Sequence, residues 1–222
     1  MPRLSGTRKA LLTAMMKDAI VDAAVSVLRE FGIGGTTMDR VATRAKLAKG
    51  SLYNYFENKG DLLCFVCGRI AEPTSKTIDA IVEADLPAPE KLEQILRTLS
   101  DDAVQHGGVL GWLLKNETIQ DAPSMAERRR DALGQFSAVM EQGIREGTFR
   151  ALDPAHAARM VLGCVRELFE LQATAGRCDP AREYVELVID VFLAGVSFRA
   201  GQDRGQPAGD KARVGQLAVT GQ

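Results

Sequence analysis

Cationic, hydroxyl and aromatic side chains gather near the N-terminus, in the segment 36–63. Arginine and lysine attract phosphate groups, and threonine, serine and tyrosine hydroxyls can donate hydrogen bonds to them. Glycine lets a backbone approach a phosphate closely. These residue types favour binding to a phosphate-lined groove. The candidates are Thr37, Arg44, Lys46, Lys49, Gly50, Ser51, Tyr53, Asn54, Tyr55 and Lys59.

A second possible chemistry is that of two cysteines, Cys64 and Cys67, spaced Cys-x-x-Cys on an expected helix. The spacing puts both thiols on one helix face, where they could form a redox switch or half of a metal site. A metal needs more ligands, and the two histidines are far away in sequence. The apolar neighbours favour buried cysteines that act as small hydrophobic residues.

The charge is unevenly distributed along the 222 residues, whose net charge is -1. Residues 1–60 contain 10 Lys+Arg and 5 Asp+Glu, whereas the remainder contains 18 and 24. A basic head on an acidic body indicates an anionic partner for the head.

The elements that must position the basic segment are helices, because nearly every part of the chain shows the helical period. We expect a long helix over Thr7–Phe31, stopped by the glycines that follow it. Thr36 is the expected N-cap of a short helix reaching Arg44, and a second short helix spans about Ala48–Phe56. Two short helices joined by a turn form a helix-turn-helix, whose second helix enters the major groove of DNA.

The remainder is also expected to be helical. Asn58 caps a helix that reaches about Ala84, with Pro73 as a kink or break. A helix from Ala88 to about His106 precedes a glycine-permitted bend around Trp112. Three more helices begin near Pro123, Pro154 and Pro180, where proline suits the first helical position. The fold class is therefore all-α with about nine helices. The expected domains are 1–60, a three-helix DNA-binding domain, 61–199, a helical effector-binding and dimerisation domain, and 200–222, a disordered tail.

The segment from Thr36 to Leu63 resembles the DNA-binding signature of the TetR family of bacterial transcriptional regulators. The shared features are a Thr-Thr start, an alanine-rich first helix, Lys-Gly-Ser-Leu-Tyr, an aromatic-Phe end, and Asn-Lys followed by leucines. With the preceding amphipathic helix, the resemblance covers roughly residues 13–63 and is weak beyond them.

The resemblance implies roles for individual residues. Thr37 would contact a phosphate, and Lys49, Gly50 and Ser51 would open the recognition helix. Tyr53 would brace the backbone, Asn54 or Tyr55 would reach bases or phosphate, and Lys59 would contact a flanking phosphate. One departure is Lys46, which stands where the family often has glycine. A positive φ there would cost lysine about 1 kcal/mol.

For the remaining helices the resemblance implies a homodimer that binds a palindromic operator and a small-molecule effector. The last two helices are the candidates for the dimer seam, although the same faces could be intramolecular core. The seam candidates are Val161, Val165, Leu168, Leu187, Val188, Val191 and Phe192. The candidate lining of a largely apolar effector pocket is His106, Trp112, Met125, Phe136, Met140 and Phe169.

The sequence thus predicts a ligand-responsive regulator of transcription, most simply a repressor that an effector releases from double-stranded DNA. The alternative is a redox- or metal-sensing regulator that uses Cys64 and Cys67. We find no nucleophile–base set, phosphate loop or metal-binding helix signature, so we expect no enzyme and no cofactor. The short apolar run at residues 10–16 is too brief for a membrane span, and we expect a cytoplasmic protein.

Overall fold

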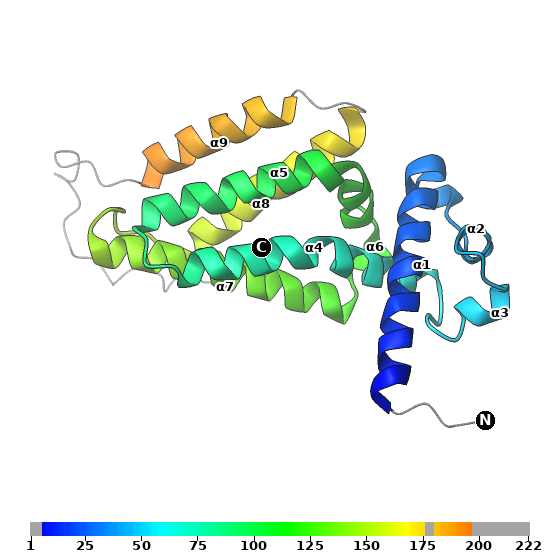
Figure 1. Ribbon diagram of the computed structural model, residues 1–222. Coiled ribbons are helices and arrows are strands. Elements are labelled where there is room, and N and C mark those ends of the chain that lie inside the picture. Colours follow the sequence, from blue (N-terminus) through cyan, green and yellow to red (C-terminus); the bar gives the residue numbers. More distant parts are fainter. Residues whose placement is uncertain (1–5, 176–179, 197–222) are drawn as a thin grey trace, which may run out of the picture.

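The computed structural model describes residues 6–175 and 180–196, and this part of the chain forms nine helices (Figure 1). The expected all-α class is confirmed. The helices of the head are α1 (Gly6–Gly35), α2 (Met38–Arg44) and α3 (Lys49–Leu52). Those that follow are α4 (Lys59–Glu83), α5 (Ala88–Leu114), α6 (Glu117–Gln120), α7 (Pro123–Glu146), α8 (Pro154–Ala175) and α9 (Pro180–Val196).

Helix α1 is the backbone of the head. It runs across the ends of the body helices, and α2 and α3 lie on its other side (Figure 1). Its buried stripe includes Ile20, Ala24, Val27 and Leu28, which pack against the core at helical spacing. Regular geometry stops at the expected glycine, since Gly32 has φ 66°.

Three helix boundaries differ from the expectations. The N-cap of α2 is Thr37, because the Thr36 side chain is buried and its hydroxyl donates to the Gly32 carbonyl oxygen at 2.7 Å. Helix α3 ends at Leu52, four residues early, and single turns carry the chain to the buried Phe56. Helix α5 continues through Trp112, so the expected bend is wrong.

The body is a bundle of α4, α5, α7, α8 and α9, with α9 outermost (Figure 1). Helix α5 lies at its centre and packs against α4, α7, α8 and α9. Gly107 and Gly111 allow α5 to cross α8 closely: a Cβ on Gly107 would lie 2.6 Å from the Gln172 Cβ, and a Cβ on Gly111 would lie 2.3 Å from the Phe169 carbonyl oxygen. Helix α4 continues through Pro73, and Gly147 ends α7 with φ 71°.

Helix α4 joins the head to the body. Its cap is the expected Asn58, whose side chain accepts a hydrogen bond from the Asp61 N–H at 2.9 Å. Phe65 on α4 packs on Phe56 with ring centroids 5.3 Å apart, and the Lys17 ammonium of α1 lies over both rings. The expected boundary at residues 60/61 therefore falls inside the first turn of α4. The expected tail, residues 200–222, lies outside the described residues.

Candidate nucleic-acid interface

The helix-turn-helix is built by two short helices that share one buried core with α1. Val41, Ala42 and Leu52 are buried, which holds α2 and α3 against the long helix. The Thr37 hydroxyl oxygen accepts a hydrogen bond from the Arg40 N–H at 3.2 Å. This cap leaves the hydroxyl proton free to donate outward.

Three of the cationic candidates have partners within the head. Arg44 forms an ion pair with Glu30 and donates to the Ser26 hydroxyl, which ties the end of α2 to α1. Lys49 lies 2.7 Å from an Asp39 carboxylate oxygen, and this hydrogen bond and charge raise the pKa of Lys49. Lys59 donates to the Ile33 carbonyl oxygen at 2.6 Å. These cations therefore brace the head as well as giving it charge.

Other candidates lie at the surface without such partners. Lys46, Tyr53 and Asn54 are exposed, and the head, within the described residues, offers their side chains no hydrogen bond or ion pair. Gly50 has open space where a Cβ would stand. Ser51 is half-buried, and Tyr55 is half-buried and packs against the core. The face around the turn between α2 and α3 is thus polar, cationic and accessible.

Lys46 occupies that turn with φ 57°, and no other non-glycine residue in the described part of the chain has a positive φ. The left-handed conformation allows the turn to close, because the Lys46 N–H reaches the Thr43 carbonyl oxygen and the Leu47 N–H reaches that of Ala42. A lysine here costs about 1 kcal/mol relative to a relaxed residue. The exposed ammonium is the compensating feature available to this position.

The six candidates for an effector pocket divide into two groups. Phe136, Met140, Met125 and Phe169 are buried and belong to the packed core. Trp112 and His106 are half-buried. Only His106 borders a cavity of about 700 Å³, which lies at the junction of α1, α4 and α5 rather than in the middle of the body.

The seam candidates also divide. Val161, Val165 and Leu168 of α8 are buried inside the chain's own core. Val188 and Phe192 are half-buried, whereas Leu187 and Val191 of α9 are 59% and 63% exposed. Met160 of α8 is 67% exposed, and it is a surface residue that the helical period alone had not singled out.

The two cysteines lie in surroundings that suppress thiol reactivity. Cys67 is buried, and desolvation raises its pKa to about 11. Burial also raises the pKa of the half-buried Cys64. Reactive cysteines show the opposite shift. Among the residues that the structure describes, no three His, Cys, Asp or Glu side chains are grouped as a metal site would require.

Sequence reasoning missed the charged cleft beside His106. Asp22 and Arg29 of α1 line it, seven residues apart on one helix face. The available signal was two charged residues, Asp22 and Arg29, spaced i, i+7 on one face of α1.

The two parts of the chain each match a known family description. Residues 20–64 match bacterial regulatory proteins of the tetR family, and residues 85–196 match the tetracyclin repressor-like C-terminal domain. Helices long and apolar enough for a membrane span do not occur in the described residues.

Among curated proteins, the chain is 27% identical over 155 residues to an uncharacterised HTH-type transcriptional regulator of Bacillus subtilis, YhgD. This match covers 66% of the chain and 78% of the relative. The chain is 26% identical over 152 residues to the fatty acid metabolism regulator protein of the same organism, covering 67% and 78%. It is 27% identical over 158 residues to the transcriptional repressor BepR of Brucella suis, covering 67% and 76%.

Among solved structures, the fatty acid degradation regulator FadR of Bacillus halodurans matches with a TM-score of 0.69 at 23% identity, covering 80% of this chain and 94% of that one. FadR of Bacillus subtilis in complex with stearoyl-CoA matches with a TM-score of 0.68 at 21% identity, covering 80% and 98%. At these identities the likeness shows the shared fold.

Proposed function

Since the chain belongs to the TetR family and is a ligand-responsive, DNA-binding regulator of transcription, we propose that it is a homodimeric repressor of a palindromic operator. The observation that carries this proposal is the accessible polar face of the helix-turn-helix, with Lys46, Tyr53 and Asn54 exposed. Two-fold symmetry would place two such faces about one DNA turn apart, ~34 Å. Effector binding would favour a dimer geometry that fits this spacing poorly.

We divide the candidate residues into those that contact DNA directly and those that act through the structure and charge of the head. Lys46, Tyr53, Asn54 and the backbone at Gly50 contact DNA directly, with the Thr37 and Ser51 hydroxyls as phosphate donors. Arg44, Lys49 and Lys59 hold the head together and contribute positive charge. Tyr55 acts mainly through packing.

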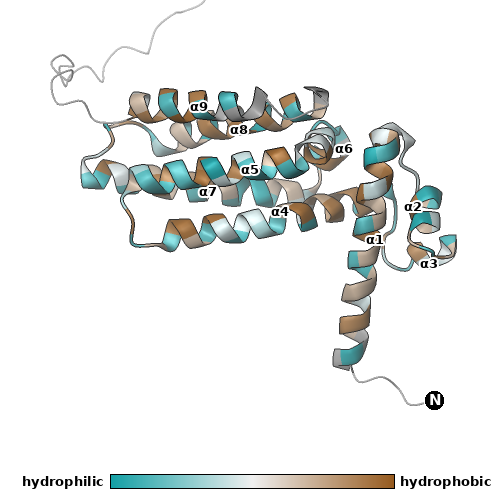
Figure 2. Ribbon diagram, turned by 45° about the horizontal axis from the view of Figure 1, so that its top comes forward, coloured by the Kyte–Doolittle hydropathy of each residue, from teal (hydrophilic) through white to brown (hydrophobic). Residues whose placement is uncertain are grey.

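The dimer seam is formed by the outer faces of α8 and α9. Met160, Leu187 and Val191 are the exposed large apolar side chains on these two helices within the described part. Leu187, Val191 and Gly195 lie four residues apart, hence on one face of α9, and Gly195 has open space around its Cα. Figure 2 shows the hydrophobic segments of the outermost helix, α9. Burying such a patch against a second copy is the standard solution for a symmetric helical dimer.

We propose that the effector is a small, largely apolar molecule and that the protein works in the cytoplasm, where operator DNA is accessible. Two similar proteins are named as regulators of fatty acid metabolism or degradation, which supports an effector with an apolar part.

The test is selection of DNA from a random-sequence pool at low salt. The unchanged protein is compared with a Tyr53→Ala, Asn54→Ala double variant and with Lys76→Ala, an exposed lysine of α4 outside the head. We expect the unchanged protein and Lys76→Ala to enrich the same palindrome, and the double variant to lose it. Failure of the folded, ligand-free protein to enrich any sequence would contradict the proposal.

A further inference from the structure

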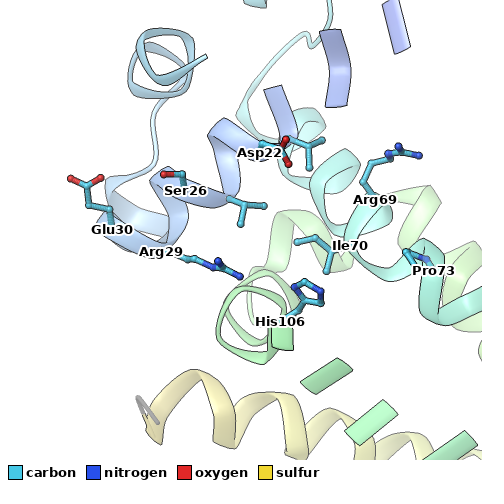
Figure 3. Close-up of a pocket in the computed structure, with 10 residues that line it drawn as sticks. Asp22, Ser26, Arg29, Glu30, Arg69, Ile70, Pro73 and His106 are labelled. Carbon is cyan, nitrogen blue, oxygen red and sulfur yellow. The ribbon is translucent and has the colours of Figure 1, made fainter. Parts of the chain in front are cut away.

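One feature that the DNA-binding face and the proposed seam leave unused is a cleft between head and body. It has a volume of about 700 Å³ and is lined by residues of α1, α4 and α5 (Figure 3). Its position matters because its walls belong to different parts of the molecule. Helix α1 carries the head, α5 is the centre of the body, and α4 connects the two.

The charged residues of the cleft differ in whether they are already paired. Arg69 is 2.7 Å from an Asp18 carboxylate oxygen and 2.6 Å from one of Glu72, and Glu30 pairs with Arg44. Arg29 and Asp22 have no hydrogen bond or ion pair of their side chains within the described residues. The cleft therefore presents one uncompensated guanidinium and one uncompensated carboxylate.

These two charges stand at different places along the cleft. Seven residues on a helix separate them by about 10 Å along its axis. Val25 lies between them on α1, and Ile70 and Pro73 of α4 supply further apolar wall. The Arg29 guanidinium reaches toward the turn of α5 that carries His106, so a cation and an imidazole N–H donor lie at the same end (Figure 3).

We propose that this cleft binds an amphipathic organic anion. Its carboxylate, sulfonate or phosphate group is held by Arg29, which presents two parallel N–H donors to an oxyanion, with His106 as a second donor. Its apolar part covers Val25, Ile70 and Pro73. Asp22 at the far end repels a second anionic group and accepts a hydrogen bond from a hydroxyl or amine.

The cleft also has a direct connection to the DNA-binding face, and this part rests on the proposed repressor function. Ser26 and Glu30 line the cleft, and both hold Arg44 at the end of α2. An anion bound beside Glu30 repels the Glu30 carboxylate and competes with it for the Arg44 guanidinium. Ligand bound between α1 and α5 therefore changes both the seating of α2 and the angle of the head on the body. A ligand that prefers one such geometry shifts the population toward it.

Binding is tested with two fluorescent probes that share one ring system. 1-Anilinonaphthalene-8-sulfonate is anionic, and N-phenyl-1-naphthylamine lacks the sulfonate. Each is titrated into the unchanged protein, Arg29→Gln, Asp22→Asn and the control Arg130→Gln, an exposed arginine of α7 away from the cleft. We expect Arg29→Gln to weaken binding of the sulfonate at least about tenfold and to leave the neutral probe within about twofold. Asp22→Asn strengthens sulfonate binding, and Arg130→Gln changes neither probe.

Equal sulfonate affinities in the unchanged protein and in Arg29→Gln would overturn the assignment of the cleft. So would equal losses of both probes, because the guanidinium would then act without regard to ligand charge.

The regulatory part has a separate readout, the affinity for a selected operator at saturating sulfonate probe. The probe should weaken operator binding by the unchanged protein and by Arg130→Gln at concentrations that leave Arg29→Gln unaffected. An operator affinity that is unchanged by bound probe would overturn the proposed coupling between the cleft and the DNA-binding face. Absence of operator binding without any probe would instead contradict the repressor function, and the fluorescence result on the cleft would stand.

Discussion

The head and the body differ in which kind of residue carries their specific information. In the head, polar residues do so, and each has a local structural assignment. Arg44 is held by Glu30, Lys49 by Asp39 and Lys59 by the Ile33 carbonyl, so the cations left for a partner can be identified. In the body, apolar side chains determine the structure, and the same apolar residue types serve three purposes.

Those three purposes are the core, the proposed seam and the proposed ligand contacts. Leu168 and Leu187 are chemically identical and both lie on amphipathic helices, yet one is 2% exposed and the other 59%. The comparison teaches that a short polar motif can identify a binding surface. An apolar stripe shows only that it is buried, and it does not show whether the chain's own core, a second copy or a ligand packs against it. Four predictions test this distinction, beginning with the largest expected effect.

The first prediction separates seam from core within α8 and α9. Leu187→Glu should weaken the dimer by at least about 100-fold, because a charge would be buried at the seam, while the monomer stays folded. Leu168→Ala should lose about 2–5 kcal/mol of stability and still form dimers. Analytical ultracentrifugation and urea denaturation give the two readouts. A Leu187→Glu protein that remains fully dimeric would place the seam elsewhere.

The second prediction concerns the close crossing of α5 and α8, which fixes the body core. A Cβ on Gly111 would meet the Phe169 carbonyl oxygen at 2.3 Å and the Ala173 Cβ at 2.6 Å. Gly111→Ala should therefore lower the free energy of unfolding by about 1–3 kcal/mol. Gly108, one turn earlier, has open space around it, so Gly108→Ala should raise stability by about 0.5–1 kcal/mol. Thermal or urea unfolding measures both, and similar effects of the two changes would be inconsistent with the crossing.

These contrasts explain how far the sequence could predict the molecule. Prolines and caps at Asn58, Pro123 and Pro154 are local signals, and the helices begin at or next to them. Thr37 rather than Thr36 caps α2 because the Thr36 hydroxyl donates its hydrogen bond to the Gly32 carbonyl oxygen. The sequence has two adjacent threonines and does not show which of them makes this bond. The cleft could not be predicted, because its lining residues, at positions 21–30, 69–73 and 106, are far apart in the sequence.

The third prediction tests whether the head tolerates backbone strain in exchange for a surface charge. Lys46→Gly relieves the positive φ and should stabilise the protein by up to about 1 kcal/mol. The same change should weaken operator binding and reduce the salt dependence by about one phosphate contact. Lys46→Ala is the matched control, since it removes the charge and keeps the strain. Unchanged salt dependence in both variants would remove Lys46 from the DNA-contacting set.

The smallest expected effect is that of the cysteines at the junction of the two regions. Since burial raises the pKa of Cys67 from 9.0 to about 11, its thiolate fraction near neutral pH falls by about 100-fold. A Cys64→Ala, Cys67→Ala variant should therefore bind operator like the unchanged protein before and after mild oxidant.

The pH dependence of stability follows from the same shift in the pKa of Cys67. The folded thiol keeps its proton up to about pH 11, whereas the unfolded one loses it near 9.0, so the free energy of unfolding falls as pH rises through this window. The double variant should lose that part of the alkaline slope in urea denaturation. Rapid alkylation of Cys67 at neutral pH, or an oxidant response that the variant lacks, would restore the thiol-sensing alternative.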